Sequence, residues 1–122
     1  MRHDIDQAHN RNQAAAAFGK KSRQHLSDTL PADEPVTAIV TGTLDGAVGV
    51  AALTDRRVIF VSKTLFKTTQ RDFPLSRISS IEWDTGRAQG TIRIHSGGQP
   101  AEITQVFAKD GGTFVTAVNG AI

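Results

Sequence analysis

Four histidines are the residues of this chain best suited to acid–base catalysis or metal binding. His3, His9 and His25 lie near the start of the chain, and His95 stands beside a Ser-Gly-Gly turn. No two of them have the spacing of a metal site, no phosphate-binding or nucleophile motif occurs, and the chain has no cysteine. The sequence therefore predicts a protein that is not an enzyme, with no catalytic residue, no metal ligand and no cofactor.

The segment Thr54-Asp55-Arg56-Arg57 contains the residue types of an anion site, because guanidinium groups bind phosphates well. The same residues are also typical of a tight turn between strands, in which Thr and Asp side chains bond to their own backbone. In that interpretation, which we favour, Arg57 pairs with a carboxylate such as Asp72 or Glu82.

Residues 56–77 carry six basic side chains against one acid, Asp72. On one rim, such side chains would bind an anionic membrane at about 1 kcal/mol each. On an outward-facing strand edge they would only discourage aggregation, and this interpretation is favoured. The loop SKTLFKTT adds two adjacent apolar side chains between lysines. The predicted interaction surface consists of Arg56, Lys63, Leu65, Phe66, Lys67 and Arg71.

Short β-type runs must position these residues. Seven such runs are separated by Asp-Gly, Thr-Asp, Thr-Gly and Ser-Gly-Gly sequences, which favour chain reversal. Sequential antiparallel hairpins are therefore expected. The predicted strands are 36–44, 47–54, 56–63, 68–74, 77–84, 90–96 and 101–107.

Helices are predicted at both ends of the chain. Residues 4–30 favour a helix with few apolar positions, which should lean on the domain or on a second copy. Asp110 is expected to cap a C-terminal helix that docks on the strands. Prolines at the end of the first helix separate an extension, 1–33, from a domain, 34–122. The predicted interface of the first helix is Ile5, Ala8, Ala15, Phe18 and Leu26.

Length and composition limit the number of domains, the cellular location and the partners to be expected of this chain. One domain fits 122 residues, and no apolar stretch reaches the roughly 18 residues needed to span a membrane. The polar N-terminus does not resemble a signal peptide, and the lack of cysteine suits a reducing compartment, so a cytoplasmic location is expected. A net charge of +2 gives no reason to expect nucleic acid as a partner.

A series of short motifs runs through residues 49–98. Thr54-Asp55 with Arg57 is followed by an apolar strand, then by Leu65-Phe66, Phe73-Pro74-Leu75 and Ile-Ser-Ser-Ile at 78–81. This order resembles the YokE-like bacterial pleckstrin-homology (PH) domain, and the resemblance extends over about residues 30–122.

The resemblance implies a mainly β fold with helices, the PH-like superfold. Seven antiparallel strands would form two near-orthogonal sheets, a partly open barrel capped by a C-terminal helix and preceded by an N-terminal one. Family resemblance also favours a loop in which Leu65 and Phe66 fold back over the core instead of forming an exposed wedge. Trp83 is expected in the core or under a helix.

Lipid-binding members of the wider superfamily gather basic residues around the loop between the first two strands. Here that loop reads TLDGAV, with no Lys or Arg, so weak or no phosphoinositide binding is expected. The PH-like fold hosts lipid, peptide and protein binding alike, so the name alone does not identify a ligand.

The predicted function is a non-catalytic interaction or scaffolding module. The first hypothesis is protein binding or self-association through the N-terminal helix and the sheet edges, with a homo-oligomer as one form. The second is peripheral binding to an anionic membrane through residues 56–77, with Leu65 and Phe66 as the wedge. The third is a phage- or prophage-encoded factor that engages a host protein, suggested by the small size and by the occurrence of such domains in phage genomes.

Overall fold

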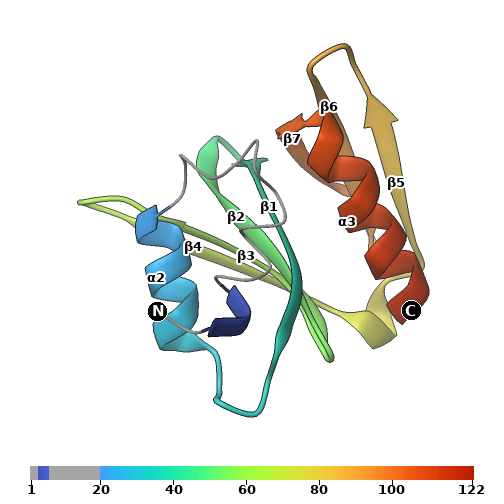
Figure 1. Ribbon diagram of the computed structural model, residues 1–122. Coiled ribbons are helices and arrows are strands. Elements are labelled where there is room, and N and C mark those ends of the chain that lie inside the picture. Colours follow the sequence, from blue (N-terminus) through green and yellow to red (C-terminus); the bar gives the residue numbers. More distant parts are fainter. Residues whose placement is uncertain (1–2, 6–19) are drawn as a thin grey trace.

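The structure, a computed structural model, describes residues 3–5, which are helical, and residues 20–122 (Figure 1). The strands lie close to their predicted ranges. The largest difference is at β5, because Leu75–Arg77 form a 3-10 helix, η2, and the strand begins only at Ser80. No helix in these residues is long and apolar enough to cross a membrane. The elements are α2 Lys20–Thr29, β1 Val36–Leu44, β2 Ala47–Thr54, β3 Arg57–Lys63, β4 Thr68–Pro74, β5 Ser80–Thr85, β6 Gln89–His95, β7 Ala101–Phe107 and α3 Ala108–Ala121.

All seven strands are antiparallel and form one hydrogen-bonded sheet in the order β4-β3-β2-β1-β7-β6-β5. The predicted PH-like architecture is confirmed, with one correction. The strands form one continuous sheet and not the two separate sheets that were predicted. The β1–β4 half and the β5–β7 half are continuous, because Thr43 pairs with Thr104 and Leu44 with Ile103. Beyond this short junction the two halves diverge (Figure 1).

The β1–β2 hairpin shows why the chain reverses where the sequence predicts. Asp45 and Gly46 have φ angles of 51° and 80°. Two successive positive φ values are those of a type I′ turn, whose twist matches that of the flanking strands. Asp and Gly are among the residues that adopt this conformation at least cost.

The main core fills the space between the two halves of the sheet, and α3 covers it. Buried side chains from the first half, such as Phe60, meet buried side chains from the second half, such as Ile92. Phe114 of α3 is also buried there. The helix begins at Ala108, so Asp110 is not the N-cap that the sequence predicts but a residue of the first turn. Its acidic side chain still suits the positive end of the helix dipole.

Trp83 lies against the first turn of α3, one of its two predicted positions. A Cβ atom on Gly111 would come within 2.2 Å of the indole ring, so glycine is required for this close approach. Gly111 is a poor helix former, but it permits the docking that stabilises the helix.

A second apolar cluster lies on the opposite face of β1–β3, under the N-terminal residues. Ile5 and Leu26 are fully buried there. Ser22 fixes α2 in place by accepting a hydrogen bond from the backbone N–H of Lys63 at 3.0 Å. The helix therefore leans on its own domain. Of the predicted helix interface, Ala8, Ala15 and Phe18 lie outside the described residues.

Candidate functional site

The turn at the start of β3 contains the predicted anion motif, and its arginines are paired with carboxylates. Arg57 donates to Glu34 Oε2 at 2.8 Å and to Asp72 Oδ2 at 2.9 Å. Thr54 Oγ1 donates to Glu34 at 2.7 Å and accepts the backbone N–H groups of Arg56 and Arg57. The geometry is that of the favoured turn interpretation, with Asp72 as the partner that the sequence indicates.

Glu34 is the centre of this arrangement and is almost completely buried. Burial by itself raises the pKa of its carboxyl group. Hydrogen bonds from Arg57 and Thr54, with the charges of Arg57 and Arg56, outweigh that effect and lower the pKa below its ordinary value. The ionised carboxylate thus ties the segment before β1 to the β2–β3 turn. Sequence reasoning missed this role, because Glu34 lies 23 residues from Arg57 and no local motif marks it.

Arg56 lies beside this cluster at the surface. Its Nη2 is 3.0 Å from Asp33 Oδ2, and its guanidinium group also pairs with Asp55 and Glu34. The hydrogen bond from Arg56 lowers the pKa of Asp33. An anion that approached this turn would have to displace carboxylates, so these residues stabilise the fold and do not offer a phosphate site.

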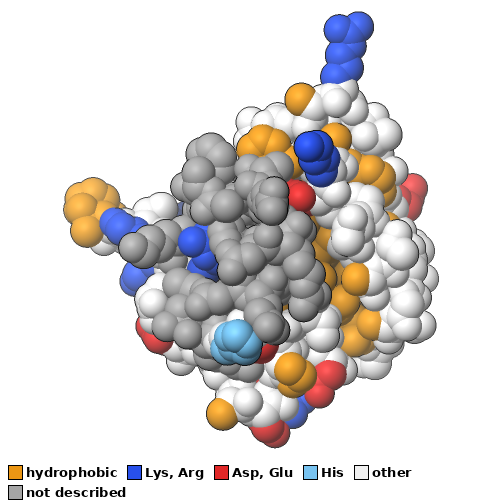
Figure 2. Space-filling view, viewed as in Figure 1, with side chains coloured by type: hydrophobic (Ala, Val, Ile, Leu, Met, Phe, Trp, Pro, Cys, Tyr) orange, Lys and Arg blue, Asp and Glu red, His pale blue; other side chains and the backbone are white. Residues whose placement is uncertain are grey.

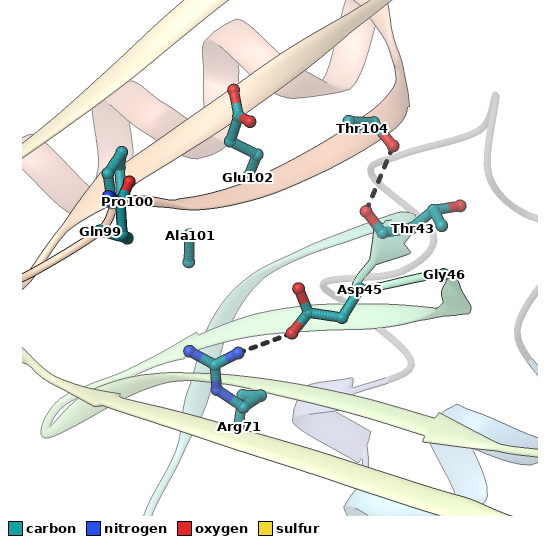
Figure 3. A pocket seen from close by; sticks show the side chains of 9 residues that line it. All are labelled: Thr43, Asp45, Gly46, Arg71, Gln99, Pro100, Ala101, Glu102 and Thr104. Atoms are coloured by element: carbon teal, nitrogen blue, oxygen red, sulfur yellow. Dashed lines mark hydrogen bonds and ion pairs between the residues drawn. The ribbon is translucent and has the colours of Figure 1, made fainter.

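A hollow of about 430 Å³ lies beside the β1–β2 turn, where lipid-binding PH domains gather basic residues. Among the residues that line it, the cation Arg71 donates to Asp45 Oδ2 at 2.8 Å (Figure 3). Glu102 directs its carboxylate away from Arg71 and pairs with Arg93. The hollow therefore lacks the free positive charge that a phosphoinositide headgroup requires.

At the other end of β3, the expectation that Leu65 and Phe66 fold back over the core is wrong. Leu65 is 77% exposed and Phe66 is 94% exposed. Strands β3 and β4 stay paired as far as Lys63 and Thr68, and hydrogen bonds between Thr64 and Lys67 close a tight turn. The turn is too short to curl back over the sheet, so the two apolar side chains project.

We call Lys63, Leu65, Phe66 and Lys67 the β3–β4 tip. Figure 2 shows a protruding group of hydrophobic side chains beside basic ones, on the side where this hairpin projects in Figure 1. Lys63 Nζ donates to Thr68 Oγ1 at 3.1 Å. Among the described residues, neither Lys63 nor Lys67 has a carboxylate within ion-pair distance.

The predicted interaction surface is therefore not one patch. Arg56 precedes β3 and Lys63 ends it, and seven strand residues at about 3.3 Å each separate them by roughly 20 Å. Arg71 is held by Asp45 at a third position. Sequence reasoning missed Lys21, which lines a hollow of about 450 Å³ with Lys63 and Leu65, between α2 and the tip.

The histidines do not converge on a site within the described residues. His95 pairs with Glu82 across the β5–β6 ladder. Glu82 is not a partner of Arg57, because β5 and β3 lie in different halves of the sheet. His25 lines the hollow beside α2, and His9 lies outside the described residues. No group of three potential metal ligands occurs in the described part of the chain.

The geometry agrees with what comparison to known proteins finds. The family model described as "Bacterial PH domain" matches residues 30–119. The chain belongs to the bacterial PH domain family. The YokE-like subtype, a narrower assignment than this match, stays a prediction. A search of curated proteins finds no match.

Two solved structures resemble this PH domain. One is a DUF1696 family protein with a pleckstrin-homology domain from Shewanella loihica PV-4, at 16% identity and a TM-score of 0.53, covering 86% of this chain and 98% of that one. The other is a pleckstrin homology domain from Shewanella amazonensis SB2B, at 17% identity and a TM-score of 0.54, covering 85% and 98%. At these identities the likeness shows the PH fold.

Proposed function

We propose that this PH domain is a non-catalytic interaction module that binds a protein partner, a second copy included, along an open edge of its sheet. The strand order carries the proposal. Among the described strands, β4 pairs with β3 alone and β5 with β6 alone, at opposite ends of the sheet. An unpaired strand side presents N–H and C=O groups that an extended segment of a partner can bind.

Strand β4 is the edge that the side chains favour. Proteins usually protect an edge strand with charges or proline. The first three residues of β4, Thr68, Thr69 and Gln70, are uncharged and lie at the surface. The charged side chains farther along the strand, Arg71 and Asp72, pair with Asp45 and Arg57 of this domain. Proline occurs only where the strand ends, at Pro74. The N-terminal helix supports the proposal less, because Leu26 is buried on its own sheet.

The proposal also includes an expectation about which ligand the hollow beside the β1–β2 turn does not bind. Because Arg71 is paired with Asp45, we expect weak or no phosphoinositide binding there. The proposal also includes a cytoplasmic setting, supported by the absence of cysteine.

Two lysines placed on β4 test the proposal. Thr68→Lys/Gln70→Lys should block strand pairing with a partner. Thr113→Lys/Thr116→Lys, on exposed positions of α3, adds the same charge elsewhere. If the partner is a second copy, light scattering should show a higher mass for the wild type and the control than for the edge variant. If the partner is another protein, capture from the native host should recover one protein with the wild type and with the control, but not with the edge variant. Equal masses and equal capture for all three proteins would reject the proposal.

A further inference from the structure

We propose that the β3–β4 tip docks on an anionic lipid surface, an activity separate from the sheet edge. Its apolar residues, Leu65 and Phe66, are the two most exposed large hydrophobic side chains among the described residues. Lys63 and Lys67 stand on either side of them in the chain. At a membrane interface, apolar side chains enter the boundary of the headgroups, and lysine stems extend so that the ammonium groups stay beside the phosphates.

The charges around the tip have the sign that this surface requires. Lys21 of α2 lines the same hollow as Lys63, and Asp28 is the acid among the residues that line it. Asp45 and Lys67 line another hollow of about 420 Å³, but the Asp45 carboxylate pairs with Arg71. The described side chains around the tip therefore leave an excess of positive charge.

The distribution of charge along helix α2 also favours an anionic surface beside the tip. The helix has no acidic residue in its first turn, where Lys21 lies, and carries Asp28 near its end. This order is the reverse of what the helix dipole favours, because the positive end of a helix is stabilised by acids. The hydrogen bond from the Lys63 backbone to Ser22 places that positive end beside the tip. An anionic surface at this position would stabilise both Lys21 and the helix dipole.

The shape of the tip favours a lipid surface over a protein. A stable protein interface covers about 800 Å² on each partner around a buried apolar centre. Here a single tight turn projects with two apolar side chains, and hollows lie on both sides of it. A fluid bilayer accepts such a wedge without a matching pocket.

Vesicle cosedimentation of the full chain tests this inference. The probes are vesicles of phosphatidylcholine alone and vesicles of phosphatidylcholine and phosphatidylglycerol in equal parts, at low and at high salt. Phe66→Ser should weaken binding to the anionic vesicles by about tenfold or more. Lys63→Glu/Lys67→Glu should weaken it by at least about 25-fold at low salt.

Two controls match these changes. Ile122→Ser removes an exposed apolar side chain at the end of α3, away from the tip, and Arg87→Glu/Lys109→Glu makes the same change of charge elsewhere. Both should bind as the wild type does, and circular dichroism checks that every variant is folded.

The proposal is overturned if the folded wild type does not bind anionic vesicles at low salt. It is also overturned if the tip variants bind like their controls, or if neutral vesicles bind equally well. A photoreactive residue at position 66 that crosslinks to a host protein but never to lipid would assign the tip to a protein partner instead.

Discussion

The two ends of β3 use basic residues in opposite ways. At its start, Arg57 is hydrogen-bonded to the buried Glu34 and to Asp72. At its end, Lys63 has no carboxylate partner among the described residues and stands beside an exposed apolar turn. Both ends belong to the same basic stretch, 56–77. The charge along a sequence is therefore not the charge of a surface, because a neutralising acid such as Glu34 comes from a segment outside this stretch.

Removing the carboxylate of Glu34, which binds Arg57 at the start of β3, should have the largest effect on the free energy of unfolding. Glu34→Ala leaves the partly buried Arg57 without its main partner, so the free energy of unfolding should fall by about 3 to 5 kcal/mol. Urea denaturation measures it. The matched control is Glu102→Ala, which removes an exposed carboxylate from Arg93 and should cost about 1 kcal/mol or less. Equal losses in the two variants would show that the Glu34 cluster is not structural.

Replacing either of two leucines by alanine should show that the covered face of the sheet contributes to stability and that the tip does not. Leu26→Ala removes a fully buried side chain and should lower the free energy of unfolding by about 2 to 5 kcal/mol. Leu65→Ala removes an exposed one and should change it by less than about 0.5 kcal/mol. Thermal or urea unfolding compares the two proteins directly. A large loss from Leu65→Ala would mean that the loop packs on the core after all.

Features that depend on neighbouring residues were easier to predict from the sequence than features that depend on distant ones. The Asp45-Gly46 turn was predictable because its two residues favour positive φ. The role of Glu34 was not, because its partners Thr54 and Arg57 lie 20 and 23 residues away in the sequence. The exposure of Phe66 was also missed, since an apolar pair in a loop has the same sequence signal whether it folds back or projects. Whether the turn is long enough to reach the core depends on how far β3 and β4 stay paired.

Lowering the pH should weaken the ion-pair cluster at the start of β3. The pKa of Glu34 is below its ordinary value of 4.5, so the unfolded chain takes up the proton more readily than the folded one. Its stabilising contribution is complete above that ordinary value and is lost as the pH falls through the lower pKa of the folded protein. Urea unfolding of the wild type should therefore show a steeper loss in acid than that of Glu34→Gln. Parallel pH profiles would contradict this assignment.

One paired measurement tests most directly whether the start of β3 serves folding and its end serves binding. The free energy of unfolding and the binding to anionic vesicles are measured for Arg57→Met and for Lys63→Glu/Lys67→Glu. We predict that Arg57→Met lowers the free energy of unfolding by about 3 kcal/mol, while its folded fraction binds vesicles like the wild type. The lysine variant should unfold within about 0.5 kcal/mol of the wild type and lose vesicle binding. A lysine variant that unfolds like Arg57→Met, or that still binds vesicles fully, would contradict the account.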